Sequence, residues 1–205
     1  MLIHPFTSII AGPTGSGKTH FLIRLLESEM INPKPDKIIY CYSRWQPLYD
    51  YLLKSVNKIT FQVGLFDNKD INPKQNNLII LDDLLEECNN NKICMDLFTV
   101  NSHHMNTSVF VLTQNIFSKG KYTRTMSINA HYLFIFKNPR DKLQIYNLAR
   151  QIYPKNMGYL IDSYEDATVK PHGYLFIDFK QNTKDDSRLQ TGILPEEKQI
   201  IYKLT

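Results

Sequence analysis

The stretch Gly12-Pro13-Thr14-Gly15-Ser16-Gly17-Lys18-Thr19 decides the fold of this 205-residue chain. It follows an apolar run at residues 6–11 and precedes apolar residues at helical spacing, and its pattern G-x-x-x-x-G-K-T is that of the phosphate-binding P-loop. Glycine tolerates positive φ, so a loop with three glycines can turn its N–H groups towards a phosphate. We therefore expect residues 12–19 to bind the phosphates of a nucleoside triphosphate.

Two side chains of this loop have expected tasks of their own. Lys18 can reach the β and γ phosphates as a point charge, and Thr19 can place its hydroxyl on Mg²⁺. The helix that begins near Gly17 adds its positive dipole end. A glycine-rich turn without a ligand is the alternative, which the complete pattern argues against. Hydrolysis is a further claim, because kinases, helicases, motors and switches share this loop.

A strand is expected after the first helix, at residues 37–42, and the strand-helix-strand order favours a right-handed parallel crossover in a doubly wound α/β fold. Arg44 follows at the carboxyl end of this strand. It could face the nucleotide or a neighbouring subunit, and the alternative is a solvated loop arginine.

Residues 77–83, Asn-Leu-Ile-Ile-Leu-Asp-Asp, read as a Walker B strand. A continuous apolar run suits a central parallel strand, and acids at its carboxyl end emerge where the P-loop opens. Because neighbours on a strand point to opposite faces, we assign Asp82 to the Mg²⁺ shell and Asp83 to the attacking water. The alternative is that the acids cap the next helix. Glu86 and Glu87 are expected to be helix-dipole partners, with Glu86 a reserve catalytic candidate.

A further apolar strand, at residues 108–113, delivers Gln114 and Asn115 to the same edge. A neutral amide there could hydrogen-bond both the γ-phosphate and the attacking water, which would couple nucleotide state to the following loop. The alternative is a turn that begins with polar residues. We expect Gln114 to be the sensor of the γ-phosphate.

The loop at residues 117–124 is the most basic short segment of the chain. Lys119 and Lys121 could contact DNA phosphates, and Arg124 could act as an arginine finger on a neighbour's nucleotide. Arg140, which follows an expected strand at residues 130–136, is a second candidate for the finger. Solvated side chains, or pairing of Arg140 with a neighbouring acid, are the alternatives.

Composition sets limits on the class of protein. The net charge of +4 is compatible with a nucleic-acid partner. Cys41, Cys88 and Cys94 lack the spacing of a disulfide framework or a zinc ribbon, which indicates a reducing, intracellular compartment. His103 and His104 make a poor metal site. No apolar run approaches the ~20 residues that span a bilayer, so we expect no membrane span.

The chain is expected to fold as a single domain, residues 1–205. Its core would cover about residues 6–194, with the last strand at residues 174–179. Residues 195–205 would form a C-terminal tail that docks on a partner.

The whole pattern resembles the FtsK/HerA superfamily of ring-forming DNA-pumping ATPases, and within it the poxvirus-type packaging ATPases of large DNA viruses and of the Polinton or adintovirus group. The similarity spans about residues 6–195. It is densest in five blocks, residues 102–109, 112–117, 136–141, 148–154 and 166–174.

This resemblance implies a RecA-like (ASCE) P-loop NTPase fold, a three-layer αβα sandwich with a mainly parallel sheet. It implies ATP hydrolysis with Mg²⁺, coupled to pushing double-stranded DNA, independently of sequence, into a capsid. By matching position it supports Lys18 and Thr19 for nucleotide and Mg²⁺, Asp82 for Mg²⁺, Asp83 as the catalytic acid and Gln114 as the sensor. The family often has Glu where this chain has Asp83, and Asp is the shorter acid.

The resemblance also implies a homo-oligomeric ring, capsid proteins as partners, and a place in the host nucleus or a cytoplasmic viral factory, or in the virion. It favours Arg124 over Arg140 as the finger. The first alternative function is a P-loop nucleoside or nucleotide kinase, which would need an acceptor-binding lid with arginines. The second is a scaffold or switch that binds ATP without hydrolysing it.

Overall fold

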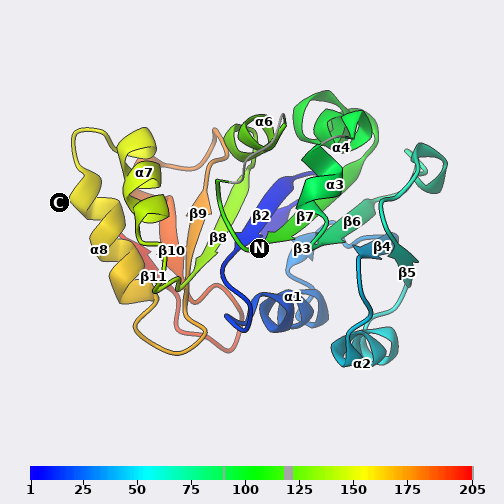
Figure 1. Ribbon diagram of the computed structural model, residues 1–205, viewed down its shortest axis with the longest axis horizontal. Coiled ribbons are helices and arrows are strands. Elements are labelled where there is room, and N and C mark those ends of the chain that lie inside the picture. Colours follow the sequence, from blue (N-terminus) through cyan, green and yellow to red (C-terminus); the bar gives the residue numbers. More distant parts are fainter. Residues whose placement is uncertain (90, 118–121, 205) are drawn as a thin grey trace.

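The computed structural model describes residues 1–89, 91–117 and 122–204, and this part of the chain forms a nine-stranded sheet with helices on both faces (Figure 1). The strands are β1 (Leu2–Ile3), β2 (Thr7–Ala11), β3 (Ile31–Asn32), β4 (Lys37–Tyr42), β5 (Ile59–Val63), β6 (Asn77–Asp82), β7 (Thr107–Thr113), β8 (Tyr132–Phe136), β9 (Tyr174–Asp178), β10 (Leu189–Thr191) and β11 (Ile200–Tyr202). β1 and β3 pair separately in a small parallel sheet.

The helices alternate with the strands of the large sheet. They are α1 (Lys18–Glu27), α2 (Pro47–Ser55), α3 (Leu85–Asn89), α4 (Lys92–Asp96), α5 (Ser102–His104), α6 (Thr123–Ile128), α7 (Leu143–Ile152) and α8 (Met157–Ala167), with 3₁₀ turns η1 (Asn68–Asp70) and η3 (Asp185–Ser187) and a π-helical segment η2 (Leu97–Asn101). None of the described helices is both long and apolar enough to cross a bilayer.

The order of the strands positions the site. It is β11-β10-β9-β8-β2-β7-β6-β4-β5, and the six strands from β8 to β5 run parallel. β7 lies between β2, which leads into the P-loop, and β6, which ends in the two acids. In the register of these strands Ala11 pairs with Thr113, and Leu112 pairs with Asp82. The P-loop, Gln114 and Asp83 therefore leave the sheet at one edge.

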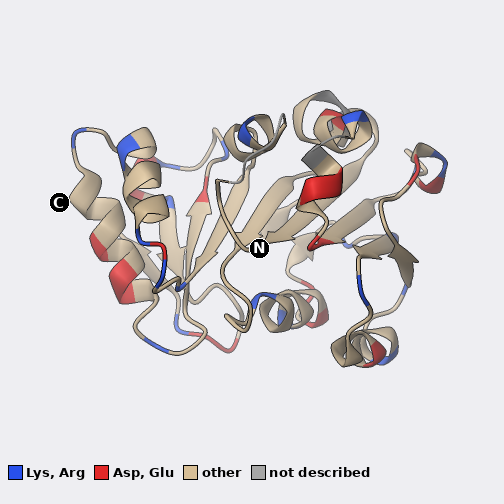
Figure 2. Ribbon diagram, viewed as in Figure 1, with Lys and Arg blue, Asp and Glu red and all other residues tan. Residues whose placement is uncertain are grey.

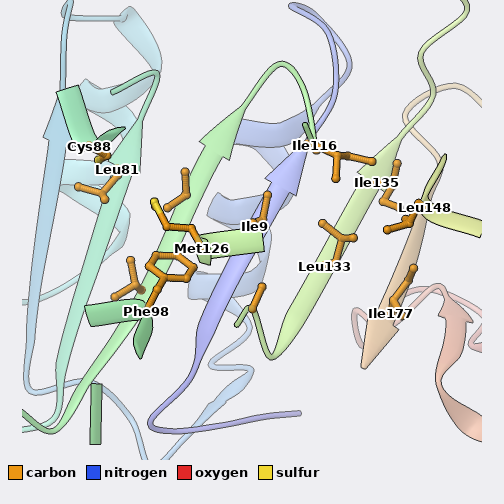
Figure 3. Close-up of a cluster of buried hydrophobic side chains, with 14 of the residues drawn as sticks. Ile9, Leu81, Cys88, Phe98, Ile116, Met126, Leu133, Ile135, Leu148 and Ile177 are labelled. Atoms are coloured by element: carbon orange, nitrogen blue, oxygen red, sulfur yellow. The ribbon is translucent and has the colours of Figure 1, made fainter. Parts of the chain in front are cut away.

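Each central strand is buried on both faces, which explains its unbroken apolar sequence. Alternate residues enter different cores: Ile9 packs in one cluster with α3, α4, α6, α7 and α8, and Ile10 packs in the other with α1 and α2. Figure 3 shows the first cluster, in which Cys88, Phe98 and Met126 cover the strands. The sheet thus forms the middle layer of three.

Helix α1 follows the P-loop because its apolar residues return to one face. Phe21, Leu22 and Leu25 are buried against the sheet. The ring of Phe21 lies 4.9 Å from that of Phe134 and 4.6 Å from that of Tyr174. This packing holds the amino end of α1 at the carboxyl edge of β2.

One expectation for the carboxyl end of the chain is wrong. β9 is not the last strand, because β10 pairs antiparallel with it and β11 pairs antiparallel with β10. Residues of the expected docking tail contact their own domain, where Tyr202 Oη donates to Asp166 Oδ2 at 2.6 Å and Glu196 Oε1 accepts from Arg24, and docking of this segment on a partner stays a prediction. Strands of three residues are too short to show an alternating pattern.

The amino terminus is held by a buried histidine. His4 Nε2 lies 3.0 Å from Asn106 Oδ1, and His4 Nδ1 lies 2.5 Å from Ser108 Oγ, which also accepts the Phe6 N–H. A neutral ring that donates from Nε2 and accepts at Nδ1 satisfies all these groups. Burial lowers the pKa of His4 below its ordinary 6.5, and Lys180 also lowers it, against the raising effects of Asn106 and Asp36.

The lowered pKa of His4 predicts acid sensitivity. As the pH falls below ~6.5, His4 is protonated in the unfolded chain before it is protonated in the folded one. The contribution of neutral His4 to the unfolding free energy should therefore be fully present above pH ~6.5 and be lost as the pH falls towards the folded pKa. Urea denaturation of the wild type and His4→Gln between pH 5.5 and 7.5 measures this. The variant should be less stable at pH 7.5 but lose less stability on acidification, and equal slopes would refute the prediction.

Candidate functional site

The P-loop is tied to the neighbouring strand and closed tightly. The Gly12 N–H donates to Thr113 O at 3.1 Å, and the Ser16 N–H donates to Pro13 O at 3.2 Å. A Cβ at Gly12 would lie 2.7 Å from Phe136 Cβ, closer than such atoms approach, so β8 leaves room only for glycine. The loop expected from the sequence thus has a backbone fixed by the two strands beside β2.

Gly17 forms the amino cap of α1 with φ of 105° and no side-chain cap. The first N–H groups of a helix lack partners within the helix, and with the helix dipole they form an anion site. Ser16 Oγ is also buried without a hydrogen-bond partner among the described residues. A phosphate in the loop would supply an acceptor to these donors.

The Lys18 side chain folds back over the loop. Its Nζ donates to Gly12 O at 2.6 Å and to Pro13 O at 3.0 Å. Burial lowers the pKa of Lys18, and the charges of Asp82 and Asp83 oppose that shift. The ammonium therefore lies in the field of both acids, as the Walker pattern requires.

A turn distant in sequence covers the P-loop. His172 Nδ1 lies 3.1 Å from Ser16 O, and a Cβ at Gly17 would come within 3.0 Å of the same nitrogen. No motif in the sequence assigned His172 to the phosphate-binding site. The signal available for His172 was its place in one of the blocks that carry the family resemblance.

Asp82 ends β6 as a buried carboxylate, with 6% of its surface exposed. Its Oδ2 accepts hydrogen bonds from Tyr40 Oη at 2.5 Å and Tyr49 Oη at 2.9 Å. Burial raises the pKa of Asp82, while the two hydroxyls and Lys18 lower it. Sequence reasoning missed both tyrosines, because the pairing of β4 with β6 brings Tyr40 to Asp82 and the packing of α2 brings Tyr49 there.

Asp83 lies at the start of the loop after β6 and is exposed. Its φ is 56°, in the left-handed region that residues with side chains seldom adopt, and its N–H donates to Leu112 O at 3.3 Å. Asp82 is buried and Asp83 is not, so the two acids have the separate environments that their strand positions predict. Strained backbone of this kind clusters at functional sites.

Two cavities flank the P-loop edge. One of about 450 Å³ is lined by Lys18 and Thr19 with His172 and Tyr174. The other, of about 890 Å³, is lined by residues of three segments at the carboxyl ends of β4, β6 and β7: Ser43, Arg44, Asp83, Leu85, Glu86, Glu87, Thr113, Gln114, Asn115 and Phe117. The second cavity brings together Asp83, Gln114 and Arg44. This is the position that Arg44 would need in order to face the nucleotide.

The two candidate fingers lie elsewhere. Arg124 is exposed on α6, where Figure 2 shows basic colour, and Arg140 is exposed after β8. Neither lines either of the two cavities. Asp141 accepts from Gln144 Nε2, and no ion pair joins it to Arg140 in the described ranges. The predictions for Lys119 and Lys121 fall outside the described residues.

Thr19 and Asp82 are the residues expected from the sequence to hold Mg²⁺. Among the described residues, no three His, Cys, Asp or Glu side chains cluster as a metal site of protein ligands would require. Mg²⁺ needs no such cluster, because it is commonly held by one or two protein oxygens, substrate phosphates and water. The Asp82 carboxylate at the end of β6 and the Thr19 hydroxyl in the first turn of α1 are oxygen ligands of the kind that set needs.

No protein-family model matches the chain, and no curated protein matches it in sequence. Several solved structures match it in fold. One is B204, the DNA-packaging ATPase from Sulfolobus turreted icosahedral virus, with a TM-score of 0.56 and 13% identity over 98% of both chains.

A second is the genome packaging NTPase B204 from Sulfolobus turreted icosahedral virus 2 in complex with sulfate. It has a TM-score of 0.57 and 14% identity over 98% of this chain and 96% of that one. The same protein in complex with ATP-γS aligns at a TM-score of 0.51 and 13% identity, over 97% and 96%. At these identities the likeness concerns the fold, and it confirms the expected RecA-like P-loop architecture with a mainly parallel sheet.

Gly17 gives a test of the loop geometry. Gly17→Ala should lower the unfolding free energy by about 1–3 kcal/mol, because alanine is strained at positive φ and its Cβ meets His172. Urea denaturation without nucleotide measures this. Gly158→Ala is the control. Gly158 lies within α8, and a Cβ there would meet only Asp162 Oδ2, at 3.9 Å. Its effect should be neutral or stabilising by up to about 1 kcal/mol, and equal stability of both variants would contradict the prediction.

Proposed function

We propose that this protein is an ATP-hydrolysing motor of the FtsK/HerA type that moves double-stranded DNA into a viral or virus-like capsid. One observation carries the enzymatic part: β7 lies between β2 and β6, in a register that sets Gln114 beside the P-loop and the acid pair. A phosphate clamp, a carboxylate and a neutral amide then meet around one edge. These are the parts that phosphoryl transfer to water needs.

Residues 12–19 bind the triphosphate in this proposal. Loop N–H groups and the amino end of α1 contact phosphate oxygens, and Lys18 exchanges its two loop carbonyls for β and γ oxygens. Thr19 and Asp82 hold Mg²⁺, which when bound neutralises charge on the phosphates.

Asp83 and Gln114 act on the water. Asp83 accepts a hydrogen bond from the water and orients it in line with the bond to be broken, and the Gln114 amide bonds the γ-phosphate and the same water. Oxygen attack on the γ phosphorus breaks the bond to the β-phosphate oxygen and yields ADP and inorganic phosphate. Loss of the γ-phosphate removes a partner of Gln114, the first residue after β7, on the amino-terminal side of the basic residues 117–124.

The packaging role is supported by the likeness to B204 over nearly all of both chains, and by the blocks that resemble the packaging family. The protein would act as a homo-oligomeric ring with capsid proteins as partners, in the host nucleus or a viral factory. Arg124 and Arg140, exposed and outside both cavities, are the candidates for a finger on a neighbour's nucleotide.

A nucleotide kinase fits the cavity beside Asp83 poorly. Asp83, Glu86 and Glu87 line it, and among its described lining residues Arg44 is the one cation; Figure 2 shows the acidic colour on α3. A phosphorylated acceptor would be repelled by such a wall, because like charges within a few ångströms raise its energy. Water is not repelled.

Substitutions at Lys18 and Asp83 test the hydrolytic site. Lys18→Ala should abolish ATP binding and turnover. Asp83→Asn should keep ATP binding and lower kcat by about 10²-fold or more, because the water loses its acceptor. Phosphate release and equilibrium nucleotide binding measure the two effects, with Lys198→Ala as the exposed control. Normal turnover by Lys18→Ala would refute the site.

DNA dependence tests the motor. Phosphate release should rise on addition of double-stranded DNA of any sequence. The logarithm of the DNA association constant should fall linearly with the logarithm of the salt concentration, with a slope of ~0.9 for each phosphate contacted. Oligomeric state should be read in the same sample. ATP-dependent phosphorylation of a nucleoside or nucleotide, without phosphate release, would favour the kinase instead.

A further inference from the structure

An aromatic cluster surrounds the buried side of the Walker B acid. It comprises Tyr40 and Tyr42 of β4, Trp45, Tyr49 of α2 and Phe61 of β5. The ring of Tyr40 stacks on Phe61 at 4.9 Å, and it lies 4.9 Å from the ring of Tyr49. Tyr40 is fully buried and Tyr49 is 1% exposed. Packing on all sides fixes both phenol rings, and with them the directions of their hydroxyl groups.

Both hydroxyls point at one atom. Tyr40 Oη and Tyr49 Oη donate to Asp82 Oδ2 at 2.5 and 2.9 Å. In the part of the chain that the structure describes, no hydrogen bond to the other oxygen, Oδ1, is found. The carboxylate is therefore bound asymmetrically, with one oxygen held by the protein and the other left for a ligand at the sheet edge.

We propose that Tyr40 and Tyr49 are positioning residues that hold Asp82 through Oδ2, so that Oδ1 is presented to the Mg²⁺ shell of the bound nucleotide. This inference rests on the proposed assignment of Asp82 to Mg²⁺. A carboxylate on a freely rotating side chain loses rotational freedom when it meets a metal shell, and two fixed donors remove that freedom in advance. Partners of this kind typically contribute 10–100-fold to metal affinity.

The two tyrosines that hold Asp82, which we call the tyrosine clamp, also connect the proposed Mg²⁺ site to the surface. Tyr49 lies on α2, and the ring of Trp45 meets it edge-on at 5.5 Å and 89°. Trp45 is the only tryptophan of the chain and is 44% exposed. Its fluorescence therefore reports on the ring that carries one of the two donors.

The experiment compares nucleotide binding with and without metal. The ratio of the ATP-γS dissociation constants in EDTA and in excess Mg²⁺ gives the coupling between nucleotide and metal, read by Trp45 fluorescence and by calorimetry. Tyr49→Phe and Tyr40→Phe should each lower this ratio about 10-fold, with little change in the EDTA constant. Tyr51→Phe is the matched control, because Tyr51 lies on the same helix, is 52% exposed and bonds Glu27 instead.

Asp82→Asn separates the inference from the function on which it rests. If both tyrosine variants keep the wild-type ratio while Asp82→Asn loses it, the clamp is refuted and the metal assignment stands. If Asp82→Asn also keeps the ratio, the assignment of Asp82 fails and the clamp fails with it. A role in folding alone would lower the melting temperature of the nucleotide-free variants and leave the ratio unchanged.

Discussion

The parallel register of β2, β7 and β6 is the constraint on which the rest of the site depends. Ala11, Thr113 and the Asp82–Asp83 step come level across three adjacent strands, so three loops begin at one edge. A slip of one residue would exchange the two faces of a strand. Because apolar cores lie on both faces, such a slip gains no burial on either side and misplaces polar ends. The packing of the sheet thereby fixes the chemistry at its edge.

That edge holds a buried acid, Asp82, and a half-buried ammonium, Lys18. Burial raises the pKa of Asp82 and lowers that of Lys18, and each charge counters the shift of the other. An unpaired buried charge is costly, so the two groups stabilise each other's ionised form, and the tyrosine hydroxyls add to this on the acid. The same low polarity strengthens the interaction of Lys18 with any phosphate that enters the loop.

Much of this arrangement was predictable from local sequence. The expected strand at residues 37–42 agrees with β4 in full, because it has flanking turn residues and a clear apolar pattern. The P-loop and the acid pair were predictable as contiguous motifs. The sequence also indicated that Asp82 and Asp83 would face different surroundings.

The missed features depend on long-range contacts. Tyr40 reaches Asp82 across 42 positions and His172 reaches Ser16 across 156, and no local period encodes either contact. β10 and β11 are too short to be recognised from an alternating apolar pattern. In β11, Ile200 and Ile201 are 40% and 44% exposed, so their apolar side chains do not indicate a buried strand. Only the pairing of β11 with β10 identifies it as part of the sheet.

The charge balance at the Asp83 cavity bears on assembly. Hydrolysis builds negative charge on the γ-phosphate, yet the described wall of this cavity carries Asp83, Glu86 and Glu87 against Arg44 alone. Acids are needed to orient water, and each one also destabilises the charge that develops. In the ring that we propose, a cation delivered from a neighbouring copy would relieve this conflict only where the subunits are in contact. Hydrolysis would then depend on assembly, and each site would be coupled to the next.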